Sequence, residues 1–137
     1  MADLDLARRA VAATGWRWMP GMVDTAGCRV VSDGDRGMFA CRPDGSIRDL
    51  YILGLPDLGE PATVGCLLEL VRGRWGDPEI WMMRHPHWTA RGWVTAWQVV
   101  AGHRYEELRR SDRHRGTTLA EGPTEAAALV AALEVRP

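Results

Sequence analysis

The clearest pattern of hydrophobic positions lies between residues 61 and 75. Apolar side chains recur there three or four positions apart, as they do on one face of a helix: Val64, Leu67, Leu68, Val71 and Trp75. Pro61 suits the first turn because its missing N–H needs no partner there, and Gly76 ends the pattern. The spacing predicts a central helix over residues 61–75 that buries the first four side chains of the stripe.

Shorter helices are predicted at both ends of the chain. In residues 4–14, Asp3 or Asp5 can cap the start, and one face carries Leu4, Ala7, Val11 and Thr14. In residues 124–135, Thr124 is the candidate N-cap, and the apolar stripe consists of Ala126, Leu129, Val130 and Leu133.

Between these helices the pattern is typical of strands. Residues 28–32, 38–42 and 46–53 are separated by turn sequences and predict an antiparallel meander. In the second half, residues 79–85 predict a strand that Pro86 interrupts, so that its end lies at a sheet edge or in a loop. Residues 92–100 predict another strand, with Trp93 and Trp97 on the same face.

The segment after residue 100 is less regular. Residues 101–103 predict a turn, 111–116 a polar loop and 117–120 a last strand. Between them, 105–109 could form a strand, or 106–110 a short helix. The resulting order is helix, three or four strands, helix, three or four strands, helix. It predicts an α+β fold, a mainly antiparallel β-sheet covered by helices, in a single layered domain over residues 1–137.

Composition narrows the class of protein. The 137 residues are 46% hydrophobic and 26% charged, which is typical of a soluble globular domain. The formal net charge of −1 argues against nucleic acid or an anionic membrane as the partner. No apolar run is long enough for a membrane span and no signal sequence is evident, so a cytoplasmic location is expected. Cys28, Cys41 and Cys66 lack metal-ligand spacing and are expected to be unpaired, buried thiols.

Several segments resemble small phage and prophage proteins of the ABA-sandwich family. They are the opening helix that ends in Gly15-Trp16, the Trp-Met-Pro-Gly-Met segment at 18–22, the Leu-Pro-Asp-Leu segment at 55–58, and the helices at 61–68 and 124–133. The resemblance implies an origin on a phage or mobile element, an α/β sandwich and a place in the host cytoplasm. It brings no active-site signature, and residues 84–116 depart from the family.

No catalytic pattern emerges from the sequence. It holds no nucleophile motif, no phosphate-binding glycine loop and no placed carboxylate pair, so no catalytic residue, no cofactor and no enzymatic activity are predicted. His85 and His87 would point the same way on a strand and could bind a metal, but further ligands are not evident. His103 and His114 have no predicted position near them, and no metal site is predicted.

A ligand site is predicted around residue 86, where arginine, histidine and tryptophan gather. Its main wall comprises Arg84, His85, His87, Trp88 and Arg91, with Arg17 and Trp18 as further contributors. Indole and guanidinium planes stack on bases, and guanidinium groups bind phosphates. The alternative is an exposed polar loop that tucks Trp88 into the core.

The sequence is consistent with two kinds of function. The first, by analogy with phage proteins, is a non-enzymatic anti-defence sponge that sequesters a small nucleotide-derived signalling molecule, as a homo-oligomer and most simply a dimer. The alternative is a phage-encoded protein–protein inhibitor or accessory factor without a small-molecule ligand. It predicts an exposed apolar patch around Trp81, Met82, Met83 and Trp88. A domain without a specific ligand is the third possibility.

Overall fold

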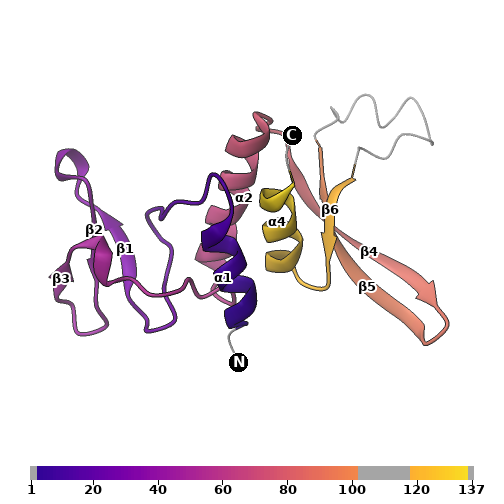
Figure 1. The fold of residues 1–137 in the computed structure, drawn as a ribbon, viewed down its shortest axis with the longest axis horizontal. Coiled ribbons are helices and arrows are strands. Elements are labelled where there is room, and N and C mark those ends of the chain that lie inside the picture. Colours follow the sequence, from indigo (N-terminus) through magenta and orange to yellow (C-terminus); the bar gives the residue numbers. More distant parts are fainter. Residues whose placement is uncertain (1–2, 102–117, 136–137) are drawn as a thin grey trace. The chain divides into compact units, whose positions relative to one another are not determined.

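The computed structural model describes residues 3–101 and 118–135. Their helices and strands are α1 (Leu4–Ala12), β1 (Arg29–Ser32), β2 (Met38–Cys41), β3 (Ile47–Arg48), α2 (Pro61–Trp75), β4 (Trp81–Thr89), β5 (Gly92–Val100), β6 (Thr118–Gly122) and α4 (Glu125–Glu134) (Figure 1). Both three-stranded sheets are antiparallel, which confirms a mixed α+β fold. The chain divides into two compact units, Met1–Cys66 and Leu67–Pro137. The single layered domain and the sandwich order of layers stay predictions.

The first unit contains the sheet β1-β2-β3. β1 and β2 pair from Arg29 opposite Cys41 to Ser32 opposite Met38. The expected long third strand over 46–53 is wrong, because β3 has only two residues and Leu50–Ile52 forms a 3₁₀ turn. A short apolar run does not by itself distinguish a strand from a tight turn.

The turn between β2 and β3 is fixed by one carboxylate. Asp44 accepts the backbone N–H of Ser46 at 2.8 Å and its hydroxyl at 2.6 Å. These two hydrogen bonds favour the charged form and hold the pKa of Asp44 below its usual value. Gly45 follows with a φ of 88°, a left-handed conformation that suits glycine.

A buried carboxylate organises the loop before β1. Asp24 is almost fully buried, and its oxygens accept the N–H groups of Ala26 at 3.0 Å, Cys28 at 2.8 Å and Gly54 at 3.1 Å. Its own N–H donates to the Cys28 carbonyl at 2.9 Å. A buried carboxylate is costly unless its lone pairs are satisfied, so these bonds tie the loop 24–28 to residue 54.

The cysteines differ in their surroundings. Cys28 and Cys41 carry free thiols, as predicted, and the Cys66 thiol donates to the Pro20 carbonyl at 3.5 Å. Only Cys28 is fully buried, so the expected burial of all three is wrong. Burial raises the pKa of the Cys28 thiol, and the neighbouring Asp24 carboxylate raises it further.

α1 begins where the sequence predicts, with the Asp3 side chain accepting the N–H of Leu6 at 2.9 Å. It ends at Ala12 rather than at residue 14. Its buried face comprises Leu6, Ala7 and Ala10, whereas Leu4 is exposed. The predicted face therefore shares only Ala7 with the observed one, because an alanine-rich helix offers overlapping stripes.

α2 has the predicted bounds but buries a different face. Leu67 and Val71 are fully buried, as expected, while Val64 and Leu68 are only half-buried. The buried positions beside them are Thr63 and Leu70. The Thr63 hydroxyl accepts the N–H of Val23 at 3.0 Å, so a hydrogen bond lets a polar residue occupy the buried face.

The second unit is built on the sheet β4-β5-β6, which α4 packs against. Gly122 allows the close approach of α4, because a Cβ atom there would lie 2.6 Å from the backbone N of Ala128. Thr124 caps α4 as predicted, accepting the N–H of Ala127 at 3.1 Å. The Trp75 indole donates to the carbonyl of Ala132 at 3.0 Å and joins the end of α2 to α4.

β4 continues through Pro86 to Thr89, so the predicted end at residue 85 is wrong. Among the described strands β4 lies at the edge of its sheet, where the N–H that Pro86 lacks is tolerated. β5 has the predicted bounds, and β6, described over Thr118–Gly122, continues past the predicted end at residue 120. The predictions for 105–110 and 111–116, for residues 102 and 103 of the expected turn, and for residue 117 of the last strand lie outside the described residues. In the described part of the chain, no helix has the length and apolarity needed to cross a lipid bilayer.

Candidate functional site

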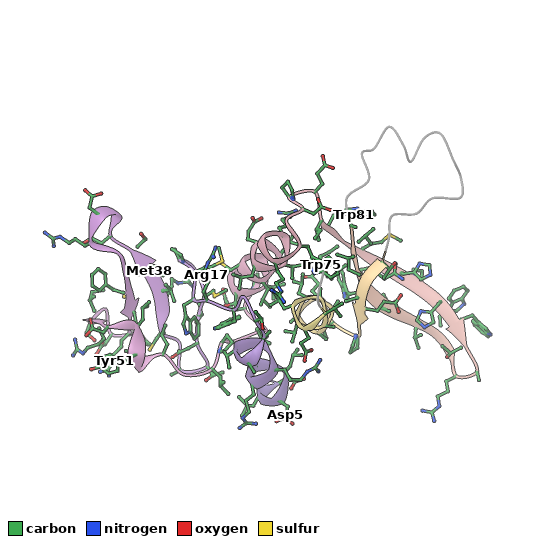
Figure 2. All side chains as sticks on the ribbon, turned by 45° about the horizontal axis from the view of Figure 1, so that its top comes forward. Asp5, Arg17, Met38, Tyr51, Trp75 and Trp81 are labelled. Carbon is green, nitrogen blue, oxygen red and sulfur yellow. The ribbon has the colours of Figure 1, made fainter. Side chains whose placement is uncertain are left out.

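The hairpin of β4 and β5 extends past the third strand of its sheet (Figure 1). β6 pairs only with Trp97–Val100 of β5. Within the described residues, positions 92–96 of β5 therefore pair with β4 alone, in a register that runs to Thr89 opposite Gly92. We call residues 84–97 the distal ribbon. It presents two faces, and Figure 2 shows side chains on both of them.

The register assigns the paired side chains of the distal ribbon to one of two faces. Successive residues of a strand alternate, and directly opposed residues share a face. One face, the tryptophan face, consists of Arg84, Pro86, Trp88, Trp93, Thr95 and Trp97. The other, the histidine face, consists of His85, His87, Thr89, Val94 and Ala96, with Gly92 opposite Thr89.

Two exposed indoles dominate the tryptophan face. Trp88 and Trp93 are 68% and 69% exposed and lie opposite each other on the two strands. Their ring centroids are 5.4 Å apart with an interplanar angle of 77°, an edge-to-face contact. The alternative that tucks Trp88 into the core is therefore wrong, and Trp93 does not lie in the core either.

Farther from the turn, a cation lies over the third indole. The guanidinium carbon of Arg84 is 5.5 Å from the centroid of Trp97, the residue opposite it. This cation–π contact holds the arginine against the tryptophan face while its side chain remains exposed. The face thus combines a fixed positive charge with two accessible indoles.

The histidine face brings its two imidazoles together. The ring centroids of His85 and His87 are 6.3 Å apart and the rings are nearly parallel, at 19°. His85 is half-buried and His87 is exposed. The prediction that these two side chains point the same way is confirmed. No group of three or more potential metal ligands occurs in residues 3–101 and 118–135.

The predicted wall of the ligand site is divided by this geometry. Arg84 and Trp88 lie on the tryptophan face, whereas His85 and His87 lie on the opposite face. Arg91 occupies the turn, where its N–H donates to the Thr89 hydroxyl at 3.2 Å. The five residues do not form one wall, because the segment is a continuous strand and turn instead of a loop.

The two further contributors belong to the first unit. Trp18 is half-buried and makes an edge-to-face contact with Trp16, with centroids 5.6 Å apart. Arg17 is exposed (Figure 2).

The hairpin has a charge of its own. Residues 81–100 include Arg84 and Arg91 and no aspartate or glutamate, although the whole chain has a formal net charge of −1. Both arginines are exposed. The hairpin therefore offers a locally basic surface next to its indoles, which the net charge of the chain conceals.

Sequence reasoning missed the exposed position of Trp93 beside Trp88 and the buried position of Asp24. A signal for Trp93 was present, since Trp88 and Trp93 each stand one residue outside the pair Thr89 and Gly92 that closes a two-residue turn. Such spacing places the indoles opposite each other if the turn is recognised. Asp24 carried no comparable signal, because its donors come from backbone groups up to 30 positions away.

Comparison of the chain with protein-family models, with curated proteins and with solved structures finds no match.

Proposed function

We propose that this chain acts by binding another protein through the tryptophan face of its distal ribbon. The observation that carries the proposal is the exposed pair of Trp88 and Trp93. Large apolar side chains exposed together are costly in water and are typical of interaction sites. Tryptophan and arginine are also the residues that contribute most often to the strongest contacts in protein interfaces.

The charge of the hairpin indicates which kind of partner surface is complementary to it. Arg84 and Arg91 flank the indoles, and no carboxylate of residues 81–100 neutralises them. A complementary surface has an apolar pocket for an indole and acidic side chains around it. This activity matches the expectation of a phage-encoded inhibitor or accessory factor that works without catalysis.

The test starts in the cells that naturally produce the chain. A photo-crosslinking amino acid at position 95, an exposed position on the tryptophan face, identifies the partner by mass spectrometry. The partner is then purified, and its affinity is measured by calorimetry for wild type, Trp88→Ser/Trp93→Ser and Tyr51→Ser. Tyr51 is 83% exposed in the first unit and serves as the matched control.

The proposal predicts at least a tenfold loss of affinity in the double tryptophan variant and no change in Tyr51→Ser. Arg91→Glu is expected to weaken binding further because it reverses the charge beside the indoles. Equal affinity of the folded double variant and the wild type would reject the tryptophan face as the binding surface. A crosslink only to a second copy of the chain would instead support the expected homo-oligomer.

A small nucleotide-type ligand is the second candidate function, and one observation favours it. Arg84, Trp88 and Trp93 share one face, where indoles can stack on a base and a guanidinium can bind phosphate. A thermal-shift screen with nucleotides tests this, because a ligand that binds only the folded state raises its melting temperature. A sponge releases the ligand intact after heat denaturation, whereas an enzyme releases product.

A further inference from the structure

The histidine face holds a pair of metal-ligating side chains that the proposed binding function does not use. His85 and His87 alternate with Pro86, which points to the other face. We propose that these two histidines form a bidentate site for a divalent transition metal of the copper, nickel and zinc class, with water in the remaining coordination positions. This inference is independent of the tryptophan face.

The backbone supplies the spacing that such a site needs. Positions i and i+2 of a strand lie about 6.6 Å apart on one face. The imidazole centroids are already 6.3 Å apart with nearly parallel planes. Metal–nitrogen bonds of about 2.0–2.1 Å require the rings to turn and approach by about 2 Å. His87 is exposed and can make most of this movement.

The surroundings leave the pair accessible and uncrowded. The residues opposite the histidines are Ala96 and Val94, whose side chains offer neither a competing charge nor a hydrogen-bond donor. The strand itself fixes both backbones, so little conformational entropy is lost on chelation. Because the residues that the structure describes include no third ligand nearby, the site is open and its affinity is modest.

The expected order of affinity follows from the ligand type. Imidazole nitrogen binds copper(II) more tightly than nickel(II) or zinc(II), as in most nitrogen sites. A metal-binding imidazole must be neutral, so occupancy falls as the solution becomes acidic. Copper(II) is therefore the probe of choice, in a non-coordinating buffer near neutral pH.

The experiment compares full-length variants by calorimetry and electron paramagnetic resonance. Wild type is expected to bind one copper(II) ion with two equivalent imidazole nitrogens in the spectrum. His87→Ala is expected to lower the affinity at least tenfold. The matched control is His87→Ala/Trp88→His, which restores the number of histidines in the ribbon but places them on opposite faces.

The control decides between chelation and simple histidine content. If the strand geometry creates the site, His87→Ala/Trp88→His binds copper(II) as weakly as His87→Ala. All variants retain His103, His114 and the amino terminus, so background binding is constant. Undiminished affinity in folded His87→Ala, or full recovery in the control, would overturn the proposal.

Discussion

At the residue scale, Asp24 shows how one buried carboxylate can hold a loop. Asp24→Asn keeps one oxygen acceptor but replaces the other with an amide donor. One of the N–H groups of Ala26, Cys28 or Gly54 then loses its acceptor. We expect the free energy of unfolding to fall by about 1–3 kcal/mol.

Urea denaturation of Asp24→Asn checks this value. The control is Asp49→Asn. Asp49 is exposed in the same unit, and its side chain forms no capping hydrogen bond. If the two variants were equally stable, the hydrogen bonds of Asp24 would contribute nothing to the fold.

Cys28 provides a prediction with a defined pH dependence. Its pKa is raised in the folded state, so between the usual value of 9.0 and the raised value the unfolded thiol has lost its proton while the folded one keeps it. The free energy of unfolding therefore decreases as pH rises through this window. Below the window, Cys28 does not make the free energy of unfolding depend on pH. Cys28→Ala is expected to show a weaker decline of stability with pH above 9.0 than wild type.

The same burial predicts slow chemistry in the native protein. At pH 8, iodoacetamide is expected to modify half-exposed Cys41 before Cys28, as followed by peptide mass spectrometry. Under denaturing, non-reducing conditions all three thiols are expected to react. Faster labelling of Cys28 than of Cys41 would contradict the assigned burial.

At the element scale, α2 tests which face is packed. Leu67→Ala is expected to lower the free energy of unfolding by about 2–5 kcal/mol, since Leu67 is fully buried. Leu68→Ala removes the same atoms from a half-buried position and is expected to cost less than half as much. Parallel thermal and chemical denaturation of both variants measures the difference. A larger loss of stability in Leu68→Ala than in Leu67→Ala would contradict the observed buried face.

The distal ribbon is the second element with a measurable consequence. Trp88 and Trp93 form a directly opposed edge-to-face pair, which contributes about 0.5–1.5 kcal/mol beyond the burial of area. Trp88→Ala is expected to speed hydrogen exchange in residues 84–97 while the melting temperature of the protein changes little. Tyr51→Ala serves as the control, and unaltered exchange in Trp88→Ala would show that the ribbon is held by its backbone alone.

Sequence reasoning located these elements better than their faces. The bounds of α2 and β5 were predictable because Pro61, Gly76 and Gly92 mark their ends. The buried face of α2 was not, because the hydrogen bond of Thr63 to Val23 depends on a residue 40 positions away. The extension of β4 over residues 86–89 was not predicted, because a proline in a strand sequence is compatible with a sheet edge or with a loop.

At the scale of the whole molecule, charge is distributed unevenly. A formal net charge of −1 conceals a hairpin with two arginines and no carboxylate, so a composition-level argument could not find a locally basic site. Association with an acidic partner is expected to slow as ionic strength rises, while dissociation changes less. Stopped-flow association at 50 and 300 mM salt would measure this, and an insensitive rate would show that Arg84 and Arg91 take no part.

Pro86 has a consequence for the behaviour of the molecule in concentrated solution. β4 has nine residues and lies at the edge of the described sheet. The two-residue turn closes on the pair Thr89 and Gly92, whose backbone groups bond to each other. The N–H and C=O groups of alternate residues, including position 86, therefore point away from β5. An edge of this length is a template on which the strand of another copy can add and start a fibril. Because proline has no N–H to offer there, it interrupts such growth at its midpoint. Pro86→Val is therefore expected to fold as wild type but to form thioflavin-positive aggregates from solutions in which wild type stays clear.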